Sequence, residues 1–200
     1  MQSQVGHQVD PDRALVDEAT AGSLDAFETL VRRYQHRLVN YVQAMVRDSG
    51  EAEDVAQETF IRAYRSLTRF RGESAFKTWL YTIATNTART SLEQRGRRER
   101  VGDQSLDDDA QALTAEQVPS GEPDIEATLV TRDAIDRALS ALTDELRVAV
   151  VLRDVEGLEY KEIAEITGVP MGTVESRIFR ARRRLRTLLQ PLMKRRAGSV

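Results

Sequence analysis

The sequence predicts an all-α protein made of two helical domains joined by a flexible acidic linker. Apolar residues recur at intervals of three and four in the segments on both sides of the middle of the chain, which is the period of an amphipathic helix. No segment shows the alternation of period two that is typical of β-strands. Between the helical segments, residues 101–126 carry many carboxylates and no lysine or arginine.

Two long helices are expected at the start of the first domain. The apolar stripe of the first comprises Phe27, Leu30, Val31, Tyr34, Leu38, Tyr41, Val42 and Met45. Residues 48–50, Asp-Ser-Gly, are expected to break it. Acidic residues at 51 and 53 then favour the positive end of a new helix over 51–67. The inward stripe of this second helix is Ala56, Phe60, Ala63 and Leu67.

A loop over 70–74 and a third long helix complete the first domain. The stripe of this helix is Trp79, Leu80, Ile83, Ala84, Thr87, Ala88 and Leu92. The spacing places Trp79 with Ile83 toward the core and points Tyr81 elsewhere. Aromatic rings mixed with Lys77 and Arg89 are typical of surfaces that bind single-stranded nucleic acid, because bases stack on rings while cations meet phosphates. Burial in the core remains an equal alternative for Trp79.

The middle of the chain marks the domain boundary. Residues 101–124 are rich in glycine, proline and carboxylates and contain few large apolar side chains. Such a segment cannot bury enough surface to offset its ordering entropy, so a flexible linker is expected. A plain solvated tether is the alternative to any function for its charge.

The second domain carries the most informative pattern, over residues 160–189. A short helix, a tight turn at Gly168 and a second helix are expected. One stripe of the second helix is apolar, and its other faces are crowded with arginine. This pattern favours insertion of a recognition helix into the DNA major groove. A basic surface helix without a ligand is the simpler alternative.

Composition excludes several classes. The formal net charge is −3, and the chain contains no cysteine, which excludes disulfides and cysteine-ligated zinc. His7 and His36 lack metal-ligand spacing, and no carboxylate pair is defined for acid–base catalysis, so we expect no metal, no cofactor and no enzymatic activity. No signal peptide or membrane-length apolar run is visible, which predicts a soluble cytoplasmic protein that is not inserted in a membrane.

Together these segments resemble the extracytoplasmic-function (ECF) sigma factors of bacterial RNA polymerase. Four stretches carry the resemblance: AFETLVRRYQHRLVNYV (26–42), AEDVAQETFIRAYRSL (52–67), FRGESAFKTWLYTIATNTAR (70–89) and the long segment 139–185. The wording SRIFRAR is most similar to the sigma-E envelope-stress branch. The resemblance implies a tail over 1–12, a region 2 domain over 13–98, a linker over 99–127, a region 4 domain over 128–192 and a basic tail over 193–200.

The resemblance also implies a set of contact residues. Contacts with the β′ clamp helices of core polymerase would come from Asp54, Gln57, Glu58, Ile61 and Arg65. Recognition of the single-stranded −10 element, including a flipped base, would come from Phe70, Arg71, Gly72, Ser74, Lys77, Trp79, Tyr81, Asn86 and Arg89. Recognition of the double-stranded −35 element would come from Thr173, Glu175, Ser176, Arg177, Phe179, Arg180 and Arg183. Phe60 is expected to support the polymerase surface from behind.

One residue departs from the sigma-E pattern. Glu175 stands where relatives of that branch often carry a basic residue. A carboxylate repels phosphate unless it accepts from a cytosine amine or pairs with an arginine, so a different −35 preference is expected, which selection from a randomised −35 library would measure.

The resemblance further implies partners and regulation. The region 4 domain would contact the β flap of polymerase, and the acidic linker would follow the path of exiting RNA. An anti-sigma factor would hold the protein inactive until a stress response releases it.

Three other classes remain as alternatives. A response regulator can end in a similar helix-turn-helix, but its first domain usually contains strands. A hydrolase or nuclease would require a defined catalytic set. A plain repressor would bind duplex DNA and would need no surface for polymerase.

Overall fold

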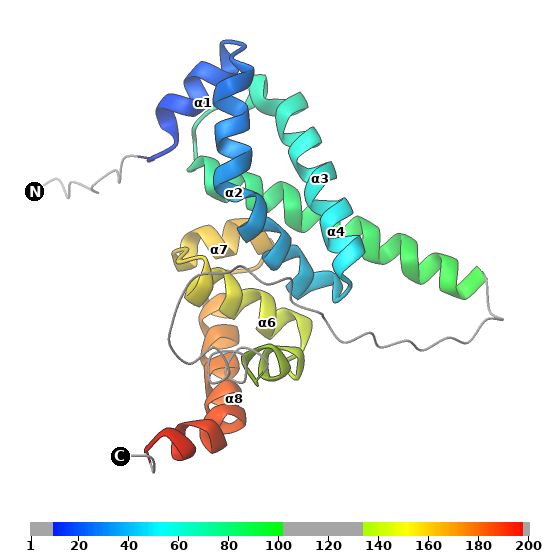
Figure 1. Ribbon diagram of the computed structural model, residues 1–200, viewed down its shortest axis with the longest axis vertical. Coiled ribbons are helices and arrows are strands. Elements are labelled where there is room, and N and C mark those ends of the chain that lie inside the picture. Colours follow the sequence, from blue (N-terminus) through cyan, green and yellow to red (C-terminus); the bar gives the residue numbers. More distant parts are fainter. Residues whose placement is uncertain (1–9, 102–133, 198–200) are drawn as a thin grey trace, which may run out of the picture.

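The computed structural model describes residues 10–101 and 134–197, with side chains described through residue 98 and from 134 to 190. The described residues contain helices and no strand, which confirms the all-α prediction. In chain order the elements are α1 Arg13–Thr20, α2 Leu24–Val46, α3 Ser49–Ser66, the 3-10 turn η1 Leu67–Arg69, α4 Phe76–Val101, a helical segment over 134–140, α6 Asp144–Val150, the π-helical turn η2 Val151–Val155, α7 Tyr160–Thr167 and α8 Met171–Ala197 (Figure 1).

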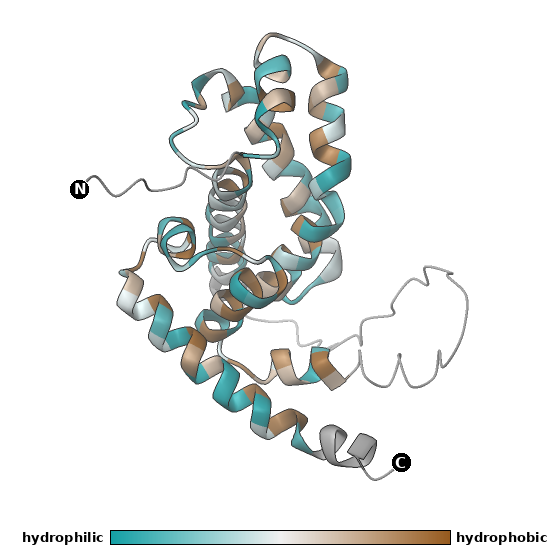
Figure 2. Cartoon of the chain, turned by 90° about the vertical axis from the view of Figure 1, so that its left-hand side faces the viewer, coloured by the Kyte–Doolittle hydropathy of each residue, from teal (hydrophilic) through white to brown (hydrophobic). Residues whose placement is uncertain are grey.

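The first domain is built around α2, which contacts α1, α3 and α4. The predicted stripe of α2 is buried at Leu30, Leu38 and Tyr41, while Phe27 and Val31 are partly exposed. The Tyr41 hydroxyl lies 2.7 Å from the Thr85 hydroxyl of α4. Figure 2 shows the more hydrophobic sides of these helices turned toward one another. Apolar burial of this kind is the main stabilising contribution to such a bundle.

The break between α2 and α3 differs in detail from the prediction. Arg47 adopts a left-handed conformation with φ 64°, and it ends α2. The Asp48 side chain accepts a hydrogen bond from the Glu51 backbone N–H at 2.7 Å and caps α3. Gly50 lies inside α3, so it does not supply the break. The left-handed Arg47 therefore ends α2, and the capping carboxylate of Asp48 starts α3, without a glycine at the turn.

The ordered first domain begins before the predicted boundary at residue 13. Asp12, assigned to the tail by sequence, is fully buried and accepts hydrogen bonds from Arg33 and Tyr34 of α2. Asp10 accepts from the Phe76 backbone N–H at 2.8 Å, at the start of α4. Helix α1, which the sequence analysis did not predict, follows directly. These two carboxylates tie the start of the described chain to α2 and α4.

An Asp12→Ala variant is expected to lower the free energy of unfolding by about 2–3 kcal/mol, because it leaves the buried Tyr34 hydroxyl without its acceptor. Burial, and next the hydrogen bond to Asp12, raise the pKa of Tyr34, so the hydroxyl stays neutral and must find another partner. Urea unfolding followed by circular dichroism measures the change. Asp17→Ala is the control, since Asp17 forms only an exposed ion pair with Arg13 and its loss should cost less than about 1 kcal/mol. Equal midpoints for the two variants would contradict this role of Asp12.

The second domain packs α6, α7 and α8 around a small core. Gly168 ends α7 with φ 71°, as the predicted glycine turn requires. Val174, Ile178 and Ala181 of α8 are buried, which confirms the predicted apolar stripe. Helix α8 continues to Ala197, so the backbone over 193–197, predicted to be a tail, is helical. The linker prediction from residue 102 onward lies outside the described residues.

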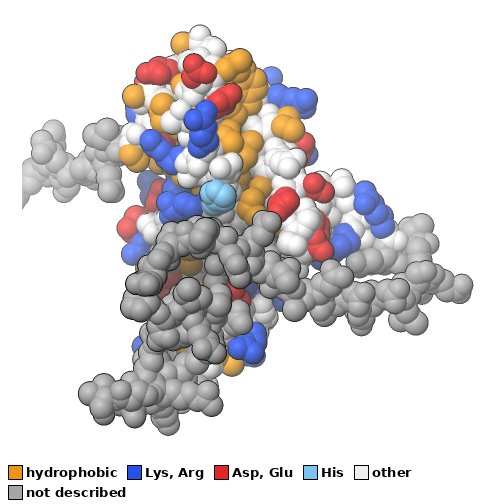
Figure 3. Space-filling model, viewed as in Figure 1, with side chains coloured by type: hydrophobic (Ala, Val, Ile, Leu, Met, Phe, Trp, Pro, Cys, Tyr) orange, Lys and Arg blue, Asp and Glu red, His pale blue; other side chains and the backbone are white. Residues whose placement is uncertain are grey.

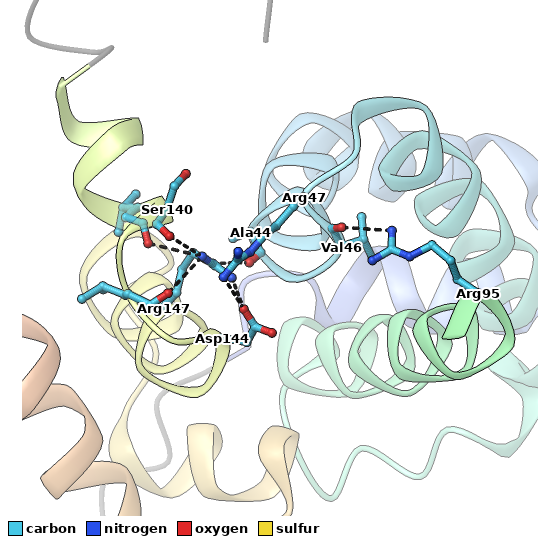
Figure 4. Close-up of polar contacts among 9 residues, drawn as sticks. Ala44, Val46, Arg47, Arg95, Ser140, Asp144 and Arg147 are labelled. Atoms are coloured by element: carbon cyan, nitrogen blue, oxygen red, sulfur yellow. Dashed lines mark hydrogen bonds and ion pairs between the residues drawn. The ribbon is translucent and has the colours of Figure 1, made fainter. Parts of the chain in front are cut away.

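The two domains lie against each other, an arrangement that the sequence analysis did not anticipate. Helix α2 contacts α6, and α4 contacts α7. Arg147 of α6 donates through Nε to the Ala44 carbonyl oxygen of α2 at 2.5 Å, and Arg47 forms a 2.8 Å ion pair with Asp144 (Figure 4). On the other side, Arg89 of α4 donates to the Thr167 carbonyl oxygen at 2.8 Å. The contacts between the domains are therefore rich in arginine.

Candidate nucleic-acid and polymerase interfaces

The outer face of α8 presents several of the predicted −35 residues to solvent. Phe179 is 68% exposed, and Ser176, Arg180 and Arg183 are exposed beside it. Arg180 donates to the Ser176 carbonyl oxygen at 3.2 Å and lies 3.3 Å from its hydroxyl, which holds the guanidinium along the helix. Arginine can form hydrogen bonds with phosphates or with the edge of a guanine, and an exposed aromatic ring can contact a thymine methyl group.

Two predicted −35 residues are not fully exposed on the outer face of α8. The Arg177 side chain is only 18% exposed and forms a 3.1 Å ion pair with Glu145 of α6, so it faces the neighbouring helix rather than the outer surface. Thr173 is partly buried in the first turn of α8. Glu175 is exposed, where it can meet DNA. The spacing of apolar residues did not reveal the turn of Arg177 toward Glu145, because that contact depends on a residue far away in sequence.

The predicted polymerase face on α3 is exposed as expected at Asp54, Gln57, Ile61 and Arg65, and Glu58 is partly exposed. Glu58 forms a 2.7 Å ion pair with Arg62 on the same helix.

The structure adds an apolar groove that the sequence analysis missed, lined by Leu24, Phe27, Glu28, Phe60, Ile61, Tyr64 and Arg65. Hydrophobic side chains gather over α2 and α3 in Figure 3. Phe60 is partly buried and lines this groove, so it reaches the surface that it was expected to support from behind. The one sequence signal for the groove was the apolar Ile61 among charged residues.

The loop before α4 is held by aromatic residues. The ring of Phe70 lies 4.9 Å from that of Trp79 and 6.2 Å from that of Phe76. Gly72 has φ 68°, a conformation that residues with a side chain rarely adopt. Arg71 is exposed, and Ser74 is partly buried. The half-buried Trp79 thus belongs to an aromatic cluster that supports the loop, and it still has an accessible edge.

The predicted −10 residues of α4 divide into exposed and covered groups. Asn86 is exposed, and Arg89 is exposed while donating to the second domain. Lys77 is mostly covered, and desolvation by burial lowers its pKa although the neighbouring Glu156 opposes that change. The prediction that Tyr81 points away from the core is wrong, because its side chain is fully buried and its ring lies 5.0 Å from that of Tyr41. The Tyr81 side chain is buried because it packs against Tyr41 of α2.

Other kinds of site are not seen in the described parts of the chain. Within residues 10–101 and 134–197, no group of histidine and acidic side chains is arranged to hold a metal ion. Over the same ranges, no helix combines the length and apolar character needed to cross a membrane.

Known proteins similar to this chain agree on one family. Residues 30–98 match Sigma-70 region 2, and residues 132–185 match Sigma-70, region 4. The RNA polymerase sigma-H factor of Pseudomonas aeruginosa is 43% identical over 189 residues, spanning 92% of this chain and 96% of the relative. The ECF RNA polymerase sigma-E factor of Escherichia coli K12 is 42% identical over 192 residues, spanning 92% and 97%. The chain belongs to the ECF sigma factors.

Solved structures of sigma factors share the arrangement of this one. The sigma factor RpoE from Bartonella quintana, in complex with the anti-sigma factor NepR, superposes with a TM-score of 0.69 at 26% identity, covering 84% of this chain and 98% of that one. CnrH in complex with the cytosolic domain of CnrY gives 0.63 at 27% identity, covering 90% and 97%. This sigma factor is therefore a non-enzymatic initiation subunit that binds core RNA polymerase and directs it to promoters.

Proposed function

We propose that the outer face of α8 recognises the −35 element, with Ser176, Phe179, Arg180 and Arg183 in contact with DNA. The observation that carries this assignment is the division of α8 into a buried apolar stripe and an exposed basic face, directly after the Gly168 turn. A helix divided in this way can enter the major groove while its other side stays packed on α6.

The −10 element is assigned to the loop over 70–74 and to α4. This region offers an unpaired strand three kinds of group. They are the cation of the exposed Arg71, the ring of the half-buried Trp79 and the amide of the exposed Asn86. Stacking on rings and neutralisation of phosphates are the general means of binding an unpaired strand. Core polymerase is assigned to α3 and its groove, because an exposed apolar strip bordered by charges is typical of a protein interface.

Regulation by an anti-sigma factor in a stress response, and action in the cytoplasm, belong to the same proposal. The two similar structures are complexes, one with the anti-sigma factor NepR and one with the cytosolic domain of CnrY, which supports this mode of control here. Boundaries near 13–98 and 128–192 enclose both matched family regions, residues 30–98 and 132–185.

Transcription in vitro with bacterial core polymerase tests the assignments. On a promoter found by mapping the transcript starts that depend on this sigma factor, Arg180→Ala should reduce promoter binding by about tenfold. Asn86→Ala should leave duplex binding nearly unchanged but reduce permanganate reactivity of the −10 strand.

Arg32→Ala removes an exposed arginine of α2 whose ion pair among the described residues is with Glu28, and it is the control for loss of charge. If Asn86→Ala and Arg180→Ala affected binding and opening equally, the separation of roles between the two domains would be wrong.

A further inference from the structure

Glu156 occupies an unusual position between the two domains. The π-helical turn η2 ends with the Glu156 backbone N–H donating to the Val151 carbonyl oxygen at 2.9 Å, five residues earlier. π-Helical turns are rare in proteins, and those that do occur are often found at functional sites. The Glu156 side chain is 2% exposed, and it enters the first domain between α2 and α4. An acidic side chain is seldom buried to this extent unless it is paired.

Two cations from the first domain surround this carboxylate. Arg37 of α2 lies 3.0 Å from Glu156 Oε2, and Lys77 of α4 lies 3.2 Å from the same oxygen. Lys77 also donates to the Glu156 carbonyl oxygen. The other carboxylate in the vicinity, Glu162, accepts from the Thr78 hydroxyl at 2.6 Å. Glu156 therefore faces two positive charges that both belong to the first domain.

A third group beside this carboxylate is poorly satisfied. The Tyr81 hydroxyl is buried next to Glu156, but it makes no well-aligned hydrogen bond to any described residue. Lys77 Nζ lies 5.6 Å from the centroid of the Tyr81 ring, on the same helix. Burial, and next the closeness of the Glu156 carboxylate to the hydroxyl, raise the pKa of Tyr81, so the hydroxyl remains a donor. A buried donor that is poorly aligned with its acceptor costs free energy that a better-fitting ligand would recover.

A phosphodiester suits these three groups better than a carboxylate does. Both cations meet Glu156 through one oxygen, Oε2, and neither that oxygen nor the Tyr81 hydroxyl makes a well-aligned hydrogen bond to a described residue. A phosphodiester is tetrahedral, presents two unesterified oxygens and carries one negative charge, so it can meet two cations and a hydroxyl at once. Charge-assisted hydrogen bonds of this kind are the strong ones.

We propose that Arg37, Lys77 and Tyr81 form a binding site for a backbone phosphate of single-stranded promoter DNA, and that Glu156 occupies this site as a phosphate mimic while the two domains are packed together. The inference rests on the assignment of α4 to the −10 strand. It adds Arg37 to the DNA-binding residues and gives the second domain an inhibitory role. The closed arrangement and −10 binding are then mutually exclusive, because one site cannot hold both anions.

Binding of a fluorescein-labelled single strand of about 12 nucleotides, taken from the −10 region of a mapped promoter, tests this in the full chain. Glu156→Gln keeps the shape of the side chain and removes its charge, and it is expected to increase affinity about tenfold. The control is Glu165→Gln, which removes the same charge from an exposed position on α7 and should change affinity less than about twofold. Equal affinities for the two variants would overturn the proposal.

A second comparison identifies the phosphate and remains informative if Glu156→Gln is unstable. Arg37→Gln should weaken binding of the strand about tenfold. Methylphosphonate linkages, which are neutral, are introduced one at a time, and one of them should abolish the difference between Arg37→Gln and the unmodified protein. If Arg37→Gln binds as the unmodified protein does, or if no linkage removes its effect, the proposed site does not bind phosphate.

A separate experiment measures whether the closed arrangement of the two domains and binding of the single strand exclude each other. Because the chain lacks cysteine, dyes can be attached at Glu18→Cys and Ala141→Cys, which are exposed positions in the two domains. The single strand should lower energy transfer between the dyes, and a fully methylphosphonate strand should not. Binding without a change in transfer would overturn the proposal. Active transcription by the same preparation would show that the proposed function stands even if this inference fails.

Discussion

An Ile61→Asp variant is expected to bind core polymerase about 100-fold more weakly, which corresponds to about 2.8 kcal/mol. Ile61 is 45% exposed and lines the groove on α3, together with the exposed Leu24 and Tyr64. A carboxylate there would have to lose water in the interface, and Arg65, which lines the same groove, would have to lose water as well to pair with it. Because the side chain is already exposed, folding should be unaffected. Titration of labelled protein with core polymerase, followed by fluorescence anisotropy, measures the loss.

A matched control exists in the second domain. Ile135 lies on the helical segment over 134–140 and is 42% exposed, so Ile135→Asp introduces the same charge at similar exposure but far from the groove. It should change affinity by less than about threefold, as expected for a position outside the buried centre of an interface. Equal losses for the two variants would indicate a general effect of charge and would remove the reason for placing polymerase on α3.

An Arg147→Ala variant is expected to destabilise the second domain by about 3–5 kcal/mol. Arg147 is 2% exposed, and burial lowers the pKa of its guanidinium. The group donates to the Ala44 carbonyl oxygen in the first domain and to the Leu142 carbonyl oxygen at 3.3 Å, and it pairs with Asp144 (Figure 4). Truncation leaves the Ala44 and Leu142 carbonyl oxygens without this donor and breaks the tie between α6 and α2.

Urea unfolding followed by circular dichroism measures this change. Arg47→Ala is the control, because Arg47 also pairs with Asp144 across the domains but is half exposed, and its loss should cost no more than about 1 kcal/mol. If Arg147→Ala unfolds at the same urea concentration as Arg47→Ala, the buried hydrogen bonds of Arg147 do not support the domain.

Local patterns in the sequence were sufficient where each residue's position depends on its own helix. The apolar stripe of α8, the turn at Gly168 and the exposed face of α3 follow from periodicity and from glycine's access to positive φ. The position of α1 could not be predicted in this way, because it depends on the buried Asp12 and its partners on α2.

Contacts between distant segments account for the errors. Tyr81 was expected to lie away from the core, but α2 and the second domain cover it. Arg177 was placed on the DNA face, but Glu145 draws it toward α6. The burial of Arg147 and Glu156 had no signal in the sequence, since charged residues are ordinarily exposed and both residues have a partner in the other domain. Such pairs become visible only when the tertiary arrangement is known.

The most direct test is to map transcription starts on a genomic fragment library with purified core polymerase and this sigma factor. The account predicts starts that vanish without the sigma factor and that share two sequence elements at a fixed spacing, one near −35 and one near −10. Arg180→Ala should relax the upstream element alone. Strong binding to duplex DNA without any sigma-dependent start would contradict the account, and the assignment of polymerase to α3 would then fall with it.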